Sequence, residues 1–220
     1  MKSKSHTKCP ICYTANSPAT ENYYRCGVCD SFYMFPIKLK DYTNGYWDAY
    51  YYSGNINNDH VDQFANIIAR KKKVFNDSVL DVGAGHGYFL YAHGGEVMGL
   101  DNNAIAIDRA KLTFGVHIDE LDVEDPFTMI QIQGTLKVKT VTLHHTIECF
   151  RTPVQTMKYL KTFADEYFHI LVQKPTVTSL KPVNFCLFNV KTIEVLSDKI
   201  GCELVEFEQN EDYIEAVLSV

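Results

Sequence analysis

The sequence VLDVGAGHGY occupies residues 79–88, and GLD follows at residues 99–101. An apolar run ends in a carboxylate, three glycines then alternate with other residues, and a second apolar run ends in another carboxylate. This order predicts a strand, a glycine loop, a short helix and a second strand. An α/β domain forms a nucleoside pocket in this way at the carboxyl ends of its strands. Glycines let the backbone approach a ligand closely, and Asp101 can accept hydrogen bonds from both ribose hydroxyls.

The spacing of the glycines separates two classes of ligand. A dinucleotide site has G-x-G-x-x-G, because a pyrophosphate binds at the helix N-terminus. Here Gly87 comes one residue early, Asp81 precedes the loop, and no basic residue is near. The pattern D-x-G-x-G-x-G followed by an acid resembles the S-adenosylmethionine site of class I methyltransferases. Its residues here are Asp81, Gly83, Gly85, Gly87 and Asp101. An NAD enzyme is a weaker alternative, and a tight strand–helix turn without any ligand is another.

Length and composition bound the protein class. The chain has 220 residues, of which 46% are hydrophobic, enough for one sizeable core and a small appendage. No apolar run approaches the roughly 20 residues of a membrane span, and the polar start lacks the apolar core of a secretory signal. We therefore expect a cytoplasmic protein with no membrane contact.

Charge is distributed unevenly along the chain. Residues 1–40 contain six Lys or Arg and two Asp or Glu and so carry a formal charge of +4. The remaining residues carry −10, which gives the total of −6. The acidic body argues against non-specific nucleic-acid binding. The basic N-terminal part leaves room for a local contact with a polyanion.

Four of the seven cysteines form a motif near the N-terminus. Cys9, Cys12, Cys26 and Cys29 read C-x2-C-x13-C-x2-C, a spacing typical of a structural Zn²⁺ site with four thiolate ligands. A disulfide framework fits the odd number of cysteines poorly, and the three scattered ones indicate free thiols in a reducing compartment. So short a segment has little core, so the metal should supply most of its folding free energy.

We divide the chain into three parts: a zinc ribbon over residues 1–40, an aromatic linker or lid over residues 41–58, and a main domain over residues 59–220. The aromatic residues of the linker either pack the ribbon onto the main domain or cover the cofactor or substrate. A helix is predicted over residues 61–75 from its apolar spacing. We interpret Lys71, Lys72 and Lys73 as a solvated helix end that complements the helix dipole.

Strands and helices alternate through the main domain, which predicts a doubly wound, mostly parallel sheet of seven strands. Two β-rich runs at the C-terminus form an antiparallel hairpin in that sheet. Beyond residue 101 we expect helices over 103–114, 153–165 and 189–200, and strands over 116–123, 137–143, 168–173, 202–208 and 213–220.

Nearly the whole chain resembles a class I S-adenosylmethionine-dependent methyltransferase with an N-terminal zinc ribbon, most closely the sugar C-methyltransferase-like group. That group often opens with C-P-x-C and Tyr-x-Cys-x-x-Cys, as at Cys9–Cys12 and Tyr24–Cys29 here. Related enzymes often read HVLEH after the fourth strand, where residues 145–149 read HTIEC. Cys149 thus replaces a second histidine, and Gln173 stands where many relatives carry an acidic residue before a proline.

The resemblance implies roles for residues of the cofactor site. Asp101 would bind the ribose, Asp122 and Val123 would contact the adenine edge, and the glycines would wrap the methionine part. The full set we assign to the cofactor is Asp81, Gly83, Gly85, Gly87, Asp101, Asn102, Asp122, Val123 and His144.

Methyl transfer depends mainly on positioning of the two reactants, and a general base helps where the acceptor is a hydroxyl or an acidic C–H. His144 and His145 lie at the carboxyl end of the predicted fourth strand, and one of them is our candidate base. The alternative is that they pack against the cofactor or orient a water. Glu148 is interpreted as a support for a histidine or as a helix cap, and His86 as facing cofactor or solvent.

We expect methylation of a small molecule, such as a nucleotide-linked sugar or a related metabolite. An RNA or nucleobase methyltransferase is the alternative, in which the basic ribbon grips phosphates and tyrosines stack on bases. A ribosomal-RNA guanine methyltransferase family also joins a zinc ribbon to this fold. A non-catalytic scaffold that binds the cofactor or a partner is a third possibility.

Overall fold

The computed structural model describes residues 7–16, 23–35, 58–132, 136–175 and 184–220. The aromatic linker, apart from Asn58, lies outside the described residues. Among the helices that the structure describes, none has the length and apolar character needed to cross a membrane.

A seven-stranded sheet forms the centre of the main domain, with strand order β11-β12-β9-β8-β5-β6-β7. The strands β5 to β9 run parallel to one another, and β12 is antiparallel to both β9 and β11. The predicted sheet and its C-terminal hairpin are therefore confirmed. The strands are β5 (Val79–Val82), β6 (Val97–Asp101), β7 (Ile118–Glu120), β8 (Val138–His144), β9 (Ala164–Gln173), β11 (Glu203–Gln209) and β12 (Tyr213–Ser219).

The strand order reverses at β5, which pairs in parallel with β6 on one side and β8 on the other. In open α/β sheets, ligands bind outside the carboxyl ends of the strands at such a switch point. The glycine loop follows β5, so the topology places it at this position.

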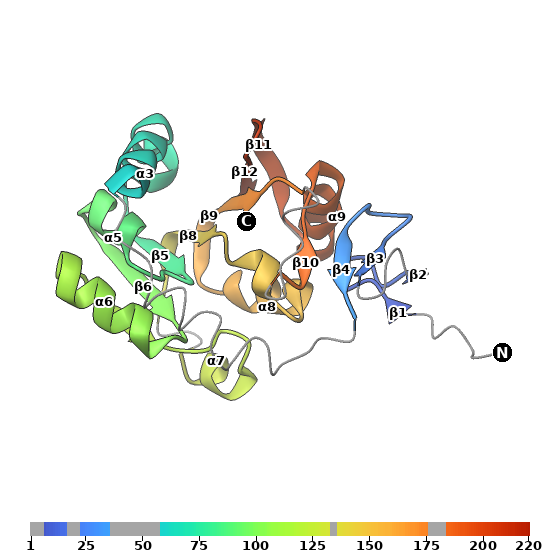
Figure 1. Cartoon of the computed structure of the whole chain (residues 1–220), viewed down its shortest axis with the longest axis horizontal. Coiled ribbons are helices and arrows are strands. Elements are labelled where there is room, and N and C mark those ends of the chain that lie inside the picture. Colours follow the sequence, from blue (N-terminus) through green and yellow to red (C-terminus); the bar gives the residue numbers. More distant parts are fainter. Residues whose placement is uncertain (1–6, 17–22, 36–57, 133–135, 176–183) are drawn as a thin grey trace.

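Helices cover both faces of the sheet (Figure 1). Apolar residues of α8 and α9 pack on one face, and those of α3, α4, α5 and α6 pack on the other. The helical elements are α3 (Asn58–Arg70), α4 (Lys72–Phe75), α5 (Tyr88–His93), α6 (Ala104–Phe114), α7 (Pro126–Ile132), the 3-10 turn η1 (Ile147–Cys149), α8 (Pro153–Leu160) and α9 (Val190–Ile200).

Alternation along the central strands decides which side chains face which helices. In β5, Leu80 and Val82 join the core under α8 and α9, whereas Val79 joins the core under α3 to α6. Every residue of β5 is buried. Such burial on both faces is usual for a parallel strand. It also puts Asp81 inside the protein, on the same face as Val79.

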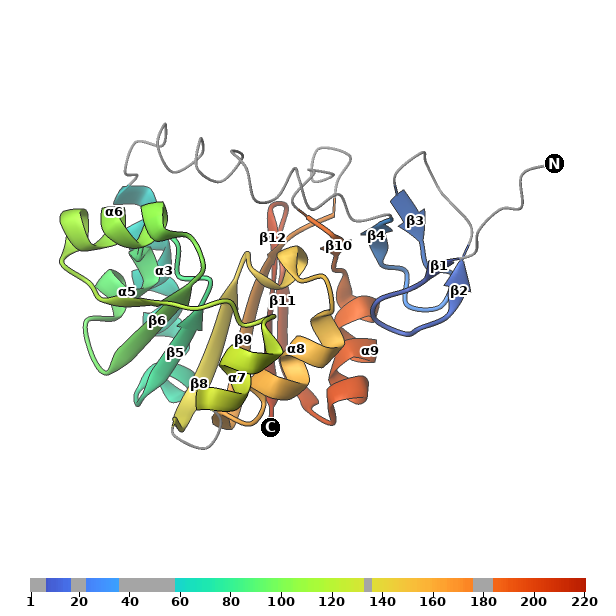
Figure 2. The ribbon, with the colours of Figure 1, turned by 90° about the horizontal axis from the view of Figure 1, so that it is seen from below.

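The four-cysteine module lies at one end of the molecule, next to β10 and α9 (Figure 2). It contains a two-stranded sheet of β1 (Thr7–Lys8) and β2 (Ala15–Asn16), and a hairpin of β3 (Tyr23–Arg25) and β4 (Phe32–Met34). The strand β10 (Cys186–Leu187) of the main domain pairs with β4 and completes a three-stranded sheet. The module is thus joined to the main domain by backbone hydrogen bonds.

Side chains at the start of α9 strengthen this junction. The Asn189 Nδ2 donates to the backbone oxygen of Asp30 at 2.9 Å, and the Thr192 Oγ1 donates to that of Cys29 at 3.0 Å. Asn189 also caps α9, because its Oδ1 accepts from the Thr192 backbone N–H. One residue therefore begins the helix and holds the cysteine module.

The sequence-based prediction was wrong around Lys71 and at the end of the helix expected over residues 153–165, because α8 ends at Leu160 and β9 begins at Ala164. The helix predicted over residues 61–75 is divided into α3 and α4 at Lys71. Lys71 is not a solvated end: its side chain is 7% exposed, and its Nζ donates to Glu206 and Glu208 at 2.6 and 2.7 Å. The glutamates come from β11, some 135 residues away, so the local sequence does not show them.

The helix α7 was not predicted. The Asp125 carboxylate accepts from the backbone N–H groups of Phe127 and Thr128 at its start, with Pro126 as the first helical residue. An acidic N-cap followed by proline is a recognised start signal.

Candidate functional site

The glycine loop passes close to two other parts of the main domain. Gly83, Gly85 and Gly87 all have positive φ angles, at 73°, 53° and 75°. A Cβ atom at Gly83 would overlap the Thr146 side chain, and one at Gly87 would lie 2.7 Å from the Val116 Cγ2. Glycine is thus required both by backbone conformation and by close packing.

Asp101, the last residue of β6, holds the loop in place. Its Oδ2 accepts from the Gly85 N–H and its Oδ1 from the Asn103 N–H, each at 2.8 Å. Burial raises the pKa of the Asp101 carboxyl, although its backbone hydrogen bonds lower it. A carboxylate oxygen accepts more than one hydrogen bond, so the group keeps acceptor capacity for a ligand.

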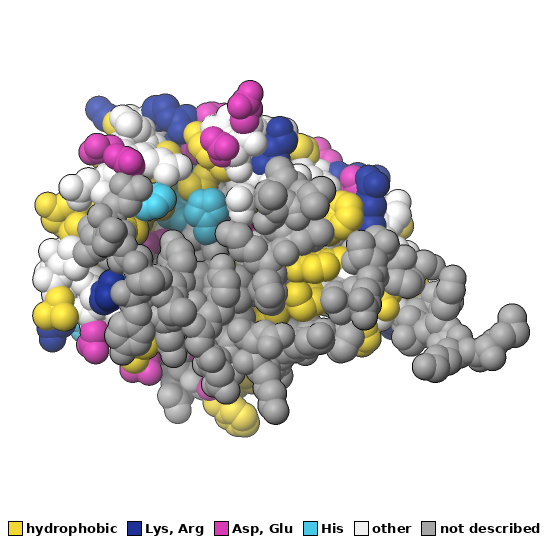
Figure 3. Space-filling model, viewed as in Figure 1, with side chains coloured by type: hydrophobic (Ala, Val, Ile, Leu, Met, Phe, Trp, Pro, Cys, Tyr) yellow, Lys and Arg dark blue, Asp and Glu magenta, His cyan; other side chains and the backbone are white. Residues whose placement is uncertain are grey.

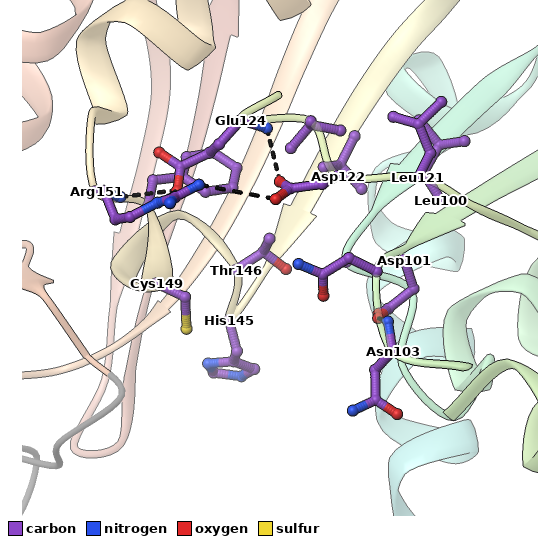
Figure 4. A pocket seen from close by; sticks show the side chains of 15 residues that line it. Leu100, Asp101, Asn103, Leu121, Asp122, Glu124, His145, Thr146, Cys149 and Arg151 are labelled. Atoms are coloured by element: carbon purple, nitrogen blue, oxygen red, sulfur yellow. Dashed lines mark hydrogen bonds and ion pairs between the residues drawn. The ribbon is translucent and has the colours of Figure 1, made fainter. Parts of the chain in front are cut away.

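A cavity with about 700 Å³ of empty space, part of it open to solvent, lies at the carboxyl ends of β5, β6 and β8. In Figure 4, His145, Thr146 and Cys149 lie on one side of it, and Asp101 and Asn103 lie on the other. The described lining residues are Val82, Gly83, Leu100, Asp101, Asn102, Asn103, Leu121, Asp122, Val123, Glu124, His145, Thr146, Cys149, Phe150 and Arg151.

Three charged residues form a cluster in the wall of this cavity (Figure 4). The Arg151 Nε donates to the Glu124 Oε2 at 2.9 Å, and its guanidinium lies 3.7 Å from the Asp122 Oδ2. The Asp122 Oδ1 accepts from the Glu124 backbone N–H at 2.9 Å. The Asp122 side chain is therefore already oriented by its neighbours.

His145 projects into the cavity from the end of β8. Its φ is 55°, a conformation that non-glycine residues seldom adopt, and its backbone N–H donates to the Leu171 oxygen at 2.7 Å. The side chain is half exposed, and its Nδ1 lies 3.9 Å from the Oε1 of buried Glu148. Glu148 is in turn held by the Gln173 N–H, at 3.0 Å.

His144 lies on the opposite side of the strand and does not line this cavity. Its ring packs against those of Phe64 and Phe89, at centroid distances of 4.9 and 4.7 Å. Its Nε2 lies 2.9 Å from the Nδ1 of His169, and its Nδ1 lies 3.7 Å from the Asp81 Oδ1. Burial lowers the pKa of His144 well below its usual value, so its ring is neutral.

Four cysteine sulfurs at the other end of the molecule converge on one point. The Sγ atoms of Cys9, Cys12, Cys26 and Cys29 all lie within 4.8 Å of one another. The Cys9–Cys29 and Cys12–Cys26 distances are 3.5 and 3.3 Å. A tetrahedral site with Zn–S bonds of about 2.3 Å places sulfurs about 3.8 Å apart. The cluster has the donors and the size to hold a metal ion.

Backbone N–H groups support these sulfurs. Ile11 N donates to the Cys9 Sγ and Val28 N to the Cys26 Sγ, each at 3.4 Å. The remaining cysteines, Cys149, Cys186 and Cys202, are free thiols outside the cluster.

The structure brings together most of the residues expected at the cofactor site. Of the nine residues assigned to the cofactor, five line the cavity: Gly83, Asp101, Asn102, Asp122 and Val123. The candidate base His145 also lines it, whereas Gly85 and Gly87 do not. Asp81 and His144 lie next to each other, and each directly precedes a residue that lines the cavity. His86, expected to face cofactor or solvent, is buried.

Several cavity residues were missed, chiefly Glu124, Thr146, Cys149, Phe150 and Arg151. All follow the carboxyl ends of predicted strands, so the rule that ligands bind there could have identified them. Their mutual contacts could not be predicted, because Glu124 and Arg151 are 27 residues apart.

Comparisons with known proteins agree on the fold. No protein-family model matches the chain, and no curated protein matches it in sequence. Magnesium protoporphyrin IX methyltransferase from Synechocystis PCC 6803, solved with bound SAH, has a TM-score of 0.57 at 15% identity, covering 82% of this chain and 96% of that one. The N-terminal domain of EvdMO1, solved with SAH and D-fucose, has a TM-score of 0.53 at 12% identity, covering 76% and 84%.

A SAM-dependent methyltransferase from Archaeoglobus fulgidus has a TM-score of 0.55 at 14% identity, covering 80% of this chain and 100% of that one. These neighbours differ widely in sequence from this chain and share its overall fold. The chain has the Rossmann-like fold of the class I S-adenosylmethionine-dependent methyltransferases.

Proposed function

We propose that this protein transfers a methyl group from S-adenosylmethionine to a small-molecule acceptor. The observation that carries the proposal is the cavity at the switch point of the sheet, where the glycine loop and Asp101 face the loop after β8. Neighbours with the same fold were solved with SAH, and one of them with D-fucose. A nucleotide-linked sugar or a related metabolite is the acceptor class that we favour.

The residues present fit this cofactor. Asp101, held by two loop N–H groups, is placed to accept from ribose hydroxyls, with Asn102 beside it. Asp122 and Val123 would border the adenine, and the backbone at Gly83, Gly85 and Gly87 would follow the methionine part. When bound, the cofactor supplies an activated methyl group on a sulfonium.

Arg151 gives the adenine wall a fixed shape. Its ion pairs with Glu124 and Asp122 hold the two acidic side chains in one arrangement before any ligand arrives. A cavity wall that is already ordered loses less entropy when a ligand binds. We assign these contacts a role in orienting the adenine.

The candidate general base is His145 rather than His144. His145 is half exposed within the cavity, whereas His144 is buried between phenylalanine rings on the other side of β8. The Glu148 carboxylate near the His145 Nδ1 would orient the ring and leave Nε2 to take a proton from the acceptor. The proton would go from the acceptor hydroxyl or C–H to that nitrogen.

The cysteine cluster is proposed to bind Zn²⁺ in a structural role. Four thiolates complete a tetrahedral shell and leave no open position for a substrate. Cys9, Cys26 and Cys29 are buried, as a closed site requires. The zinc would then stabilise the module that pairs with β10.

The acidic main domain favours a small acceptor over RNA, because the residues after 40 carry a formal charge of −10. On the face shown in Figure 3, the described Lys and Arg side chains lie in small groups among acidic ones, without a continuous basic surface. RNA binding without sequence preference relies on a positively charged groove. RNA therefore enters the acceptor screen as a comparison.

The test is an acceptor screen with nucleotide sugars and RNA, in which formation of S-adenosylhomocysteine is measured. Turnover with a nucleotide sugar, lowered by about a hundredfold or more in His145→Asn with little change in cofactor affinity, supports the proposal. His117→Asn is the matched control, because His117 is largely exposed and lies outside this cavity. Turnover with RNA alone would overturn the acceptor class, and no turnover with any acceptor would favour a scaffold.

A further inference from the structure

A row of polar side chains runs through the buried face of the sheet, from the glycine loop to the end of α3. The His144 Nε2 lies 2.9 Å from the His169 Nδ1, and the His169 Nε2 lies 2.9 Å from the Glu215 Oε1. The Glu215 Oε2 accepts from Arg70 at 3.0 Å. His169 and Glu215 are essentially inaccessible to solvent, at 0% and 1% exposure. The reaction proposed above does not use His169 or Glu215.

The hydrogen bonds in this row assign the protons. Arg70 and His169 both donate to Glu215, which keeps its pKa low and its carboxylate charged, although burial opposes this. The His169 Nε2 must therefore carry a proton. Burial lowers the pKa of His169, so its ring is neutral and its Nδ1 is an acceptor.

The same argument assigns the position of the proton on His144. Because the His169 Nδ1 is an acceptor, the His144 Nε2 must carry the proton between them. His144 is neutral as well, so its own Nδ1 has a lone pair and no proton. Among the described residues, this Nδ1 has no hydrogen-bond partner.

The unpartnered nitrogen points toward Asp81, whose Oδ1 lies 3.7 Å away and accepts from the Thr142 hydroxyl at 2.6 Å. Burial raises the pKa of Asp81 to about 7, so its carboxyl gains and loses a proton near neutral pH. Once it is ionised, the carboxylate and the unprotonated ring nitrogen are both acceptors, so they need a donor between them. Buried acceptors without donors are costly. Both residues lie directly before residues that line the cofactor cavity, namely Val82 and His145.

We propose that Glu215 and His169 are positioning residues that hold His144 with its unprotonated Nδ1 toward Asp81, where it accepts a hydrogen bond from the α-ammonium of the bound cofactor. The inference rests on the proposed function. An ammonium has three N–H donors, enough for the His144 Nδ1 and the Asp81 carboxylate together. The rings of Phe64 and Phe89 keep this corner apolar, which strengthens such a contact.

Glu215→Gln tests the direction in which the hydrogen bonds of this row are donated. The Gln carbonyl can still accept from Arg70, but its NH₂ group then donates to the His169 Nε2. His169 would carry its proton on Nδ1 and donate to the His144 Nε2, so the His144 proton would move to its Nδ1. That proton faces Asp81 and opposes an incoming ammonium.

Two measurements test the predicted change in the His144 proton position and its effect on binding. ¹⁵N NMR of the histidine side chains in the ligand-free protein should show His144 protonated on Nε2 in the wild type and on Nδ1 in Glu215→Gln. Calorimetry should show S-adenosylhomocysteine binding weakened by about tenfold or more, the size of a lost hydrogen bond to a charged group. Affinity for methylthioadenosine, which lacks the amino-acid end, should not change.

Controls separate this role from general damage. Glu208→Gln removes another partner of Arg70, but Glu208 is exposed and does not contact His169, so both ligands should bind as in the wild type. If Glu215→Gln does not fold, His169→Leu removes the same link. His169→Gln, whose amide can donate to Glu215 and accept from His144, should restore the loss caused by His169→Leu.

Four outcomes would contradict the inference. Three of them would overturn the inference and leave the proposed function standing. They are a wild-type His144 protonated on Nδ1, an unchanged S-adenosylhomocysteine affinity in Glu215→Gln, and equal weakening of binding for both ligands. If the wild type binds neither ligand, the proposed function fails and the inference fails with it.

Discussion

Asp81 shows how strongly the fold constrains a single carboxyl group. It lies fully buried in β5, and burial raises its pKa to about 7, with a further rise from nearby Asp101 and an opposing hydrogen bond from Thr142. In the unfolded chain its pKa is about 3.9. The unfolded state therefore loses this proton at lower pH than the folded state does.

This difference predicts a pH effect on the ligand-free protein. The contribution of Asp81 to stability is complete below about pH 4 and is lost as pH rises through about 7, a change of roughly 4 kcal/mol. Asp81→Asn cannot ionise, and its amide oxygen can still accept from Thr142. Its stability relative to the wild type should rise between about pH 4 and about pH 7, measured by urea unfolding. A constant difference across that range would contradict the assignment.

Gly83 carries a second prediction at this scale. Gly83→Ala places a methyl group against Thr146 at a φ of 73°, so it should cost conformational strain of about 1–2 kcal/mol and, in addition, displace Thr146 from the cavity. Gly115→Ala has a similar φ of 67° but meets open space, so it measures the strain alone. Urea unfolding should show a larger loss of stability in Gly83→Ala than in Gly115→Ala. Cofactor titration should likewise show a larger loss of affinity in Gly83→Ala. Equal losses would mean that the Thr146 contact does not matter.

Among the secondary-structure elements, the joint between α3 and α4 depends on Lys71. Its buried ammonium bridges to two glutamates of β11 and so ties these helices to the sheet edge. Lys71→Ala removes this partner from Glu206 and Glu208, which are themselves half exposed, and should destabilise the protein by about 1–2 kcal/mol. The exposed neighbour Lys72 is the control, and Lys72→Ala should change the free energy of unfolding by less than about 0.5 kcal/mol. Similar losses in both variants would contradict this role.

Elements with strong local patterns were predictable, whereas long-range contacts were not. The strands β5 and β6 and the glycine loop follow from apolar runs that end in carboxylates, and the mostly parallel sheet follows from the alternation of strands with helices. The burial of Lys71 depends on a strand far along the chain. Sequence alone also treated His144 and His145 as equivalent. The positive φ of His145, fixed by the Leu171 oxygen, is what turns its side chain into the cavity.

The cysteine motif was predictable because its spacing encodes a local geometry, and its cluster is confirmed. The junction with the main domain was not, because β10 is only two residues long and carries no strand pattern that the sequence analysis recognised. A two-residue strand gains its stability from its neighbours rather than from its own sequence. The junction therefore depends on both parts being folded.

At the scale of the whole molecule, the cysteine cluster is connected to the cavity wall. The strand β4 pairs with β10, and the Phe185 N–H next to it donates to the Glu148 backbone oxygen in η1. Metal binding of about 10–16 kcal/mol is typical for structural zinc. Loss of the metal should therefore loosen β4 and β10 together.

Hydrogen exchange of the zinc-loaded and chelated protein measures this coupling. Amides of the cysteine module and of Phe185–Leu187 should exchange faster without metal, while β5 and β6 should keep their protection. Cys26→Ser should behave like the chelated protein, whereas Cys202→Ser, outside the cluster, should retain the metal. Unchanged protection of β10 after metal removal would contradict the coupling.

The most direct test of the whole account is a calorimetric titration of the zinc-loaded protein with S-adenosylmethionine and, separately, with NAD. We predict saturable binding of S-adenosylmethionine alone, weakened by at least about tenfold in Asp101→Ala. Asp119→Ala, an exposed carboxylate on neighbouring β7 outside the cavity, should leave the affinity unchanged. A folded, metal-loaded protein that does not bind S-adenosylmethionine, or that binds it equally well without Asp101, would contradict the central claim.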